Sequence, residues 1–436
     1  ALLGNDRAIL SRYDDSVVRV VNGAVMPVRR ARGYAPQPLP LPALDRAPSC
    51  VLACGPQQKA TIALTREGTN GEATCFVSQH IGDVENGGTF DAWNAARTRL
   101  EDLFDLAPAA LACDVHPSYL SGQWAREQAR KCNLPLVEVQ HHHAHIASVM
   151  AEAIAAGQLT TDARVLGIAF DGTGAGTDGT IWGGEFLVAS LGGFERAAHL
   201  RTWALPGGAA SVRDACRNAF ALLSELGLLE HPGAARLLDS LDEQTRSVTA
   251  TMIERGINSP RTSSMGRLFD AAAAILGICD KATYEGEPAI ELEAAAWRAL
   301  DNEIAHFPDN NAGYFASGPS WLDGPYVLDQ KALFEALLGG IEAGAPADRL
   351  ALDFHVSVAR SSARIASDIC VHEGIDTVAL SGGVFMNRLL LQLLTRELKS
   401  AGLTVLVPQT VPVNDGCIAY GQAAVASARL AQVASQ

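Results

Sequence analysis

The chain has 436 residues, of which 48% are hydrophobic and 19% are charged. This composition is typical of a well-packed globular protein with two or three domains, and it excludes a disordered chain. The formal net charge of −14 disfavours nonspecific nucleic-acid binding, which needs a basic surface.

The nine cysteines are scattered singly and include no Cys-x-x-Cys pair. This pattern argues against a disulfide framework and against a zinc ribbon, and it favours a reducing compartment, so we expect a cytoplasmic protein. No apolar run reaches the roughly 18 residues that span a bilayer. The first residues lack both an initiator Met and the pattern of a secretion signal, and we expect them to follow further sequence in a longer protein.

The first segment alternates in the manner of strands over residues 9–31 and continues into a basic stretch that contains Arg29, Arg30 and Arg32. A proline-rich segment follows at 36–48, with proline at alternate positions over most of its length. Alternate prolines favour an extended, semi-rigid linker. We therefore expect a domain boundary here and assign residues 1–47 to a separate unit.

The remaining chain consists of two parts, residues 48–160 and 161–436, that begin alike with three strand-like runs and continue with alternating helices and strands. In the first part we expect strands at 50–54, 60–66 and 73–79, helix 89–106, strand 109–114, helix 121–131, strand 134–139 and helix 144–156. In the second we expect strands at 165–170, 180–189 and 197–203, a mostly helical insertion at about 205–350, helix 351–373, strand 377–380, helix 386–401, strand 404–407 and helix 415–432. The pattern predicts an α/β protein with a duplicated ribonuclease-H-like (actin-like) fold, whose two lobes bind a nucleotide between them.

Four of the eleven histidines lie within five residues, at positions 141, 142, 143 and 145, directly after a predicted strand. His141 and His145 are four residues apart, so on a helix both rings leave one face and can bind one metal ion. His142 and His143 do not share that face. Asp415, which opens the last predicted helix, is the candidate third ligand, although Asp at such a position is often only a helix cap. Two histidines and a carboxylate leave coordination positions open for a reaction.

Two glycine-rich segments are candidate nucleotide-binding turns. The first follows a buried strand and contains Asp171, Gly172, Thr173 and Gly174, and the second joins a strand to a helix and contains Gly382, Gly383 and Asn387. Glycines allow backbone N–H groups to approach a phosphate closely. An ordinary tight turn without a ligand is the alternative for each segment. Asp270 and Glu287 are candidate ribose contacts, or else surface carboxylates.

Taken together, these stretches resemble HypF-type carbamoyltransferases, the maturation factors of [NiFe] hydrogenases. The resemblance rests on DDSVVRVV, RRARGYAP, VSQHIGD, CDVHPSYLS, HHHAHIAS, DGTGAGTDGTIWGGE, ALPGG, ERGINSP, SSMGRLFDA, TYEGEPA, LSGGVFMNRLL and NDGCIAYGQ. Residues beyond the proline-rich segment resemble the actin-like carbamoyl-transfer domain of this family, which is similar to the tRNA threonylcarbamoyl-transfer enzymes (TsaD). Residues 1–35 resemble the end of the preceding YrdC-like domain.

The resemblance implies a transferase that passes a carbamoyl group from carbamoyl-adenylate to the C-terminal cysteine of HypE, after upstream domains have used carbamoyl phosphate and ATP. It implies a divalent metal, Fe or Zn, and Mg with the nucleotide, but no nucleic-acid or membrane partner. The implied metal ligands are His141, His145 and Asp415, and the implied nucleotide contacts are Asp171, Gly172, Thr173, Gly174, Asp270, Glu287, Gly382, Gly383 and Asn387. One departure is Cys417, which stands where the family has a glycine and narrows the space near the nucleotide.

Two other functions are compatible with the same motifs. One is O-carbamoylation of a small-molecule hydroxyl by an enzyme built from the same two domains in the reverse order. The YrdC-like tail precedes the actin-like part here, which favours the HypF order. The other is a nucleotide-binding scaffold without activity, which a metal at the histidine pair argues against.

Overall fold

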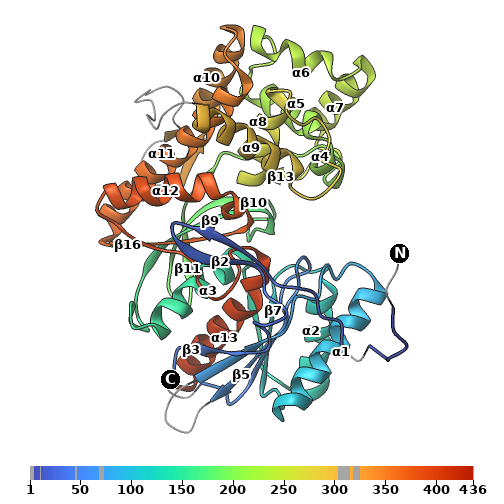
Figure 1. Ribbon diagram of the computed structural model, residues 1–436, viewed down its shortest axis with the longest axis vertical. Coiled ribbons are helices and arrows are strands. Elements are labelled where there is room, and N and C mark those ends of the chain that lie inside the picture. Colours follow the sequence, from blue (N-terminus) through green and yellow to red (C-terminus); the bar gives the residue numbers. More distant parts are fainter. Residues whose placement is uncertain are drawn as a thin grey trace. The chain divides into compact units, whose positions relative to one another are not determined.

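The computed structural model describes residues 4–9, 11–44, 47–67, 73–302, 315–317 and 325–435. The chain forms two compact units, whose elements are labelled in Figure 1. Unit 1 contains Ala1–Ala163 together with Pro408–Gln436, and unit 2 contains Arg164–Val407. Among the helices described, none combines the length and the apolar character that a membrane span requires.

Unit 1 is built on a six-stranded sheet with the order β3-β6-β5-β4-β7-β8. The strands are β3 (Pro38–Leu41), β4 (Val51–Ala53), β5 (Ala63–Glu67), β6 (Ala73–Val77), β7 (Ala110–Asp114) and β8 (Leu136–Val139). Strand β5 is antiparallel to both of its neighbours, β4 and β6, whereas β7 and β8 continue from β4 in parallel. A separate antiparallel ribbon is formed by β1 (Val17–Val21) and β2 (Ala24–Arg29).

Helices cover both faces of this sheet because its side chains alternate between two buried sides. The helices are α1 (Gly87–Phe104), α2 (Leu120–Cys132), α3 (His141–Ala155) and α13 (Ile418–Ser435). On one face Leu52 and Leu111 pack in a cluster with Trp93 of α1 and Ala125 of α2. The opposite face carries mainly small residues and packs against α13, which lies beside α3 (Figure 1).

The proline-rich segment differs from the expected linker, because residues 38–41 form the edge strand β3 and pair with β6. Along β3, Pro38 and Pro40 are exposed whereas Leu39 and Leu41 are buried. Proline has no N–H to donate to a sheet, so it is tolerated at an edge, where one side of the strand has no neighbouring strand. The extended conformation was predictable from the prolines, but the pairing depends on a strand more than 30 residues away.

Unit 2 repeats the same sheet. Its strands are β9 (Val165–Ala175), β10 (Ile181–Ala189), β11 (Phe194–Leu200), β12 (Trp203–Ala204), β13 (Arg261–Thr262), β14 (Ala316–Ser317), β15 (Tyr326–Asp329), β16 (Thr377–Ser381) and β17 (Thr404–Leu406). The order β11-β10-β9-β16-β17 matches β6-β5-β4-β7-β8 of unit 1, with the same antiparallel and parallel pairs. The predicted duplication of a ribonuclease-H-like fold is thereby confirmed.

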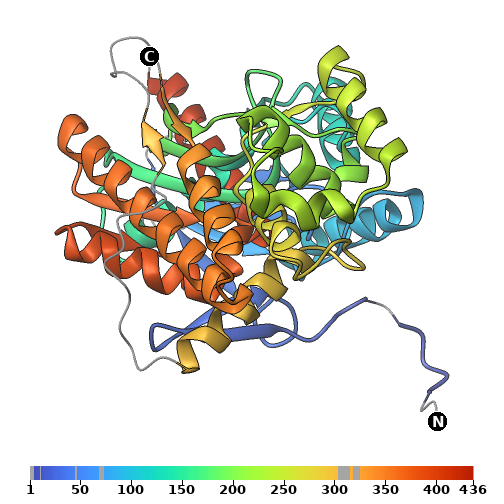
Figure 2. The same ribbon diagram turned by 90° about the horizontal axis from the view of Figure 1, so that it is seen from above.

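The insertion in unit 2 is mostly helical where the structure describes it, and residues 303–314 and 318–324 lie outside the described part. The helices of unit 2 are α4 (Ala209–Arg213), α5 (Ala215–Leu226), α6 (Ala235–Asp239), α7 (Glu243–Arg255), α8 (Met265–Ile275), α9 (Glu287–Asn302), α10 (Lys331–Glu342), α11 (Ala347–Glu373) and α12 (Arg388–Ser400). Helices α11 and α12 lie side by side in both views (Figures 1 and 2).

The last segment of the chain does not belong to the same unit as the rest of the second predicted lobe. Residues 161–436 were expected to form one lobe, yet the segment from Pro408 groups with unit 1, where α13 packs against α3 and the sheet. Asp415 therefore belongs to the same unit as the two histidines.

Candidate metal centre and nucleotide-binding turns

The histidine cluster forms the first turns of α3, which begins at His141 immediately after β8. Gln140 caps this helix, since its side-chain oxygen accepts a hydrogen bond from the backbone N–H of His143 at 2.9 Å. The rings of His141 and His145 follow one another along one helix face, with centroids 5.1 Å apart. Both side chains are buried.

Asp415 faces this pair from the 3-10 turn η4 (Asp415–Cys417), which directly precedes α13. Its Oδ1 lies 3.7 Å from His141 Nε2 and 3.6 Å from His145 Nε2. The ligand atoms of these three residues lie within 4.8 Å of one another. Metal bonds of about 2.0–2.2 Å place neighbouring ligand atoms roughly 3–3.5 Å apart, so the donor set fits one divalent transition metal.

Asp114 is a member of this cluster that the sequence motifs alone did not indicate. It ends β7, and its Oδ2 lies 2.9 Å from His141 Nδ1, with both side chains about 1% exposed. Its Oδ1 accepts from the N–H of His116 at 2.8 Å, which fixes the carboxylate. Since β7 and β8 are parallel and pair Asp114 with Val139, the strand that precedes His141 ends beside Asp114. The parallel register of β7 and β8 therefore predicts the contact between Asp114 and His141.

Glu152 holds the segment that leads to Asp415 against α3. Its carboxylate accepts hydrogen bonds from the backbone N–H groups of Gln409, Thr410 and Val411, at 2.7, 3.0 and 2.8 Å, and from the Thr410 hydroxyl. Because Glu152 lies on the same helix as His141 and His145, this clamp connects the carboxylate ligand to the helix that carries the imidazoles.

The other histidines have different surroundings. His142 Nδ1 lies 3.0 Å from Gln140 Nε2, and His143 is fully buried. In unit 2, His355 is also fully buried, and its Nδ1 lies 2.7 Å from the Ala351 carbonyl. Burial lowers the pKa of His355 to about 4, against which the Ala351 hydrogen bond acts.

The two predicted glycine turns meet in unit 2. Asp171 Oδ1 accepts from the N–H of Gly172 at 2.8 Å and from the N–H of Gly383 at 3.2 Å. Gly382 has a φ of +111°, and a Cβ there would lie 2.1 Å from the Phe170 carbonyl oxygen, so only glycine fits. The first turn is more extended than expected, because Asp171 to Gly174 continue strand β9, with Thr173 exposed and Gly174 buried.

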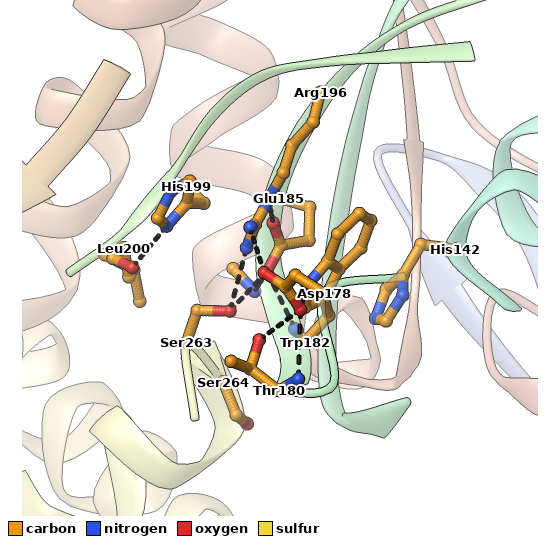
Figure 3. Close-up of polar contacts among 12 residues, drawn as sticks. His142, Asp178, Thr180, Trp182, Glu185, Arg196, His199, Leu200, Ser263 and Ser264 are labelled. Atoms are coloured by element: carbon orange, nitrogen blue, oxygen red, sulfur yellow. Dashed lines mark hydrogen bonds and ion pairs between the residues drawn. The ribbon is translucent and has the colours of Figure 1, made fainter. Parts of the chain in front are cut away.

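A network of charged and polar side chains on β10 and β11 is connected to the first glycine turn through Ser263 and Ser264 (Figure 3). Glu185 Oε2 accepts from Arg196 Nε at 2.7 Å, and Glu185 Oε1 accepts from Ser263 Oγ at 2.5 Å. Arg196 also pairs with Asp178 and lies over the Trp182 ring at 4.0 Å from its centroid. The next residue after Ser263 is Ser264, whose Oγ lies 2.8 Å from the carbonyl oxygens of both Asp171 and Gly172.

Two of the remaining predicted nucleotide contacts, Asp270 and Glu287, differ in burial. Asp270 is buried on α8 and pairs with Arg267 at 2.7 Å, and burial raises its pKa in spite of Arg267. Its other oxygen is buried and has no hydrogen-bond partner among the described residues. Glu287 is half-buried at the start of α9, and its carboxylate accepts from the Thr283 hydroxyl at 2.8 Å.

The side chain of Asn387 makes hydrogen bonds within unit 2. Its Oδ1 accepts from the N–H of Leu390 at 2.9 Å and caps α12, while its Nδ2 lies 2.8 Å from His355 Nε2. Because His355 Nδ1 faces a carbonyl and must carry the proton, Nε2 accepts from Asn387. The side chain of Asn387 therefore connects the start of α12 to His355 of α11.

Comparison with known proteins identifies relatives of both units. A model of the HypF Kae1-like domain matches residues 46–152, and a model described as "Carbamoyltransferase, Kae1-like Domain, second subdomain" matches residues 167–422. Carbamoyltransferase HypF of Synechocystis sp. is 37% identical over 433 residues, covering 96% of this chain and 52% of that protein. A "Carbamoyltransferase HypF homolog" of Cupriavidus necator is 38% identical over 387 residues, covering 88% of this chain and 92% of that protein.

A solved structure agrees with these matches. The crystal structure of full-length HypF in the phosphate- and nucleotide-bound form has a TM-score of 0.85 and 36% sequence identity to this chain, covering 98% of this chain and 62% of that one. The fold and the matched domain models define a two-lobed protein of the Kae1-like class. Within that class, the chain belongs to the HypF family. It spans about half the length of the first curated relatives that it matches, and the matches favour this family over the two alternative functions.

Proposed function

We propose that this chain is the carbamoyl-transferring part of a HypF carbamoyltransferase, and that it passes the carbamoyl group of carbamoyl-adenylate to the C-terminal cysteine thiol of HypE during [NiFe] hydrogenase maturation. The observation that carries the proposal is the convergence of His141, His145 and Asp415 in unit 1 of a chain that belongs to this family. In this proposal, carbamoyl phosphate and ATP are used by upstream domains of a longer protein, as the family resemblance implies.

The three residues provide the ligands for one divalent metal, Fe or Zn. Two imidazoles and one carboxylate are a donor set that both metals accept and that leaves positions open. When bound, such a metal supplies a Lewis acid for the carbonyl oxygen of the carbamoyl group. Asp114 orients the His141 ring by accepting the Nδ1 proton, which leaves Nε2 free of a proton and able to bind.

Unit 2 binds the nucleotide in this proposal. The glycines at 172, 174, 382 and 383 have no side chains, so a phosphate can approach the backbone of both turns closely. Asp270 offers its buried oxygen to a ribose hydroxyl, and Glu287 is the more exposed candidate for the same role. Mg²⁺ accompanies the nucleotide. These contacts position the adenylate for transfer rather than activate it.

The nucleophile comes from the partner, so none of the chain's own cysteines has to react. Burial raises the pKa values of Cys50, Cys75 and Cys113 to about 12. A thiolate is the reactive form of cysteine, and these three groups remain thiols at neutral pH. That property supports a reaction with an external thiol, for which no Ser-His-Asp set is needed.

The test is transfer to HypE by purified protein that has been supplied with carbamoyl-adenylate and metal. We expect His141→Ala and Asp415→Ala to abolish the mass increase on the C-terminal cysteine of HypE while the melting temperature of the metal-free protein changes little. His372→Ala is the matched control, because His372 lies on the surface of α11 with 54% of its side chain exposed. Full activity of either ligand variant would contradict the proposal.

A further inference from the structure

The turn that carries Asp415 touches both ring nitrogens of His145. Asp415 Oδ1 lies 3.6 Å from Nε2, and Cys417 Sγ lies 3.3 Å from Nδ1. Both contacts come from the three residues of η4. The imidazole of His145 is therefore held along both edges by one short segment, with the cysteine on the side away from the candidate metal position.

The two histidines have matching arrangements. His141 faces Asp415 through Nε2 and Asp114 through Nδ1, while His145 faces Asp415 through Nε2 and Cys417 through Nδ1. Metal-binding histidines usually donate the N–H of the second ring nitrogen to an acceptor, which fixes the tautomer and the ring orientation. Cys417 occupies the place at His145 that Asp114 occupies at His141.

The position of Cys417 follows from the packing of α13 on α3. Gly421, one helical turn after Cys417, lies so close to α3 that a Cβ on it would be 1.9 Å from the Ala144 carbonyl oxygen. This close approach brings the start of α13 against the neighbouring residue, His145. Cys417 is fully buried as a result, and its sulfur has no direction in which to turn toward solvent.

We propose that Cys417 is a positioning residue for His145: its sulfur accepts the Nδ1 proton and so keeps Nε2 directed at the metal. The inference rests on the metal site in the proposed function and adds a role for a residue that the family resemblance places as glycine. A glycine has no side chain to accept this proton. The His145 ring in this chain therefore has a fixed tautomer that a glycine at position 417 does not provide.

The experiment measures metal affinity in the full chain by competition with a chelator, using Zn²⁺ and Co²⁺. We expect Cys417→Ala to weaken binding by about 10-fold or more, the usual effect of losing such a hydrogen-bond partner. Cys417→Ser keeps an acceptor at the same place and is expected to retain affinity within about threefold of the parent. Cys50→Ala is the control, because Cys50 is equally buried in unit 1 but lies in the cluster on the other face of the sheet.

The outcomes separate this inference from the proposed function. Equal affinities for Cys417→Ala and the parent would overturn the role of Cys417 alone. A sulfur-to-cobalt charge-transfer band that disappears in Cys417→Ser would also overturn it, because the thiolate would then be a ligand. A parent chain that binds no metal, and that behaves like Asp415→Ala, would reject the metal site itself. Loss in the alanine variant with rescue by serine, at an unchanged melting temperature of the metal-free protein, supports the inference.

Discussion

At the scale of single residues, the candidate metal site depends on where protons sit on the two imidazoles. A histidine binds a metal through an unprotonated nitrogen, and the other nitrogen then needs an acceptor. Asp114 provides a carboxylate at 2.9 Å for His141. Since this carboxylate is buried and also bound by the His116 N–H, it has little freedom to leave the ring. The geometry yields a specific expectation for its substitution.

Asp114→Asn is expected to weaken metal binding by about 10- to 100-fold. If the amide oxygen keeps its bond to the His116 N–H, the amide nitrogen donates to His141 Nδ1 and moves the ring proton to Nε2, the metal-binding atom. If the amide is flipped, its nitrogen opposes the His116 N–H instead. Chelator competition measures the loss, and Asp102→Asn on the exposed side of α1 serves as the control. An unchanged affinity would show that Asp114 does not orient His141.

His355 gives a second expectation, which concerns stability rather than binding. Its pKa is about 4 in the folded protein and 6.5 in its ordinary state, so the unfolded chain binds this proton more readily. The contribution of neutral His355 to the free energy of unfolding is fully present above pH 6.5. This contribution decreases as the pH falls toward 4, by about 3 kcal/mol in total. Urea unfolding at pH 7 and at pH 4.5 is expected to show a steeper loss for the parent than for His355→Gln. Equal slopes would contradict the assignment, and His372→Gln should behave like the parent.

At the scale of elements, the crossing of α3 and α13 determines whether the ligands meet. The two helices belong to segments separated by all of unit 2, yet they pack along one another in unit 1. The contact relies on a glycine facing a backbone carbonyl, so the helices approach more closely than side chains usually permit. The Glu152 clamp then fixes the segment that precedes Asp415. Helix packing and clamp together bring the carboxylate to the imidazoles.

Gly421→Ala is therefore expected to destabilise the chain and to weaken metal binding together. The added Cβ would lie 1.9 Å from the Ala144 oxygen, and forcing atoms into a packed contact costs about 1–3 kcal/mol. Gly339→Ala is the matched control, since Gly339 is also within a helix but has no atom within 4 Å of the added Cβ. That variant should be slightly more stable, because alanine is the better helix former. Thermal melting and chelator competition test both; a harmless Gly421→Ala would refute the close crossing.

At the scale of the whole molecule, the duplicated sheet was predictable from sequence because each strand has its own local pattern. The runs at 50–54 and 165–170 correspond to β4 and β9, and the helix expected at 386–401 corresponds to α12. The pairing of β3 was not predictable, since the prolines at 38 and 40 indicate extension without naming a neighbouring strand. The sequence also did not predict that α13 belongs to unit 1, or that Asp114 contacts His141. Both features depend on which distant segments pack together.

The part of the relatives that these 436 residues match determines which reaction we expect of them. They cover about half the length of the HypF relatives, and the resemblance assigns adenylate formation to the part not matched. We expect the chain by itself to modify HypE when carbamoyl-adenylate is supplied, and to be inactive with carbamoyl phosphate and ATP. Mass spectrometry of HypE after each incubation makes the comparison. Activity with carbamoyl phosphate and ATP would mean that this chain also forms the adenylate.

The membership of α13 in unit 1 has a consequence for biosynthesis. When a ribosome has translated the chain as far as residue 163, the sheet of unit 1 still lacks the helix that covers its face of small residues. About 250 more residues must be translated before that helix begins, which takes roughly 13–50 s at 5–20 residues per second. During this interval the apolar face of the nascent sheet is exposed, and chaperones can bind it. Chains that terminate early, before Pro408, would keep that surface bare and be removed by proteolysis or aggregation.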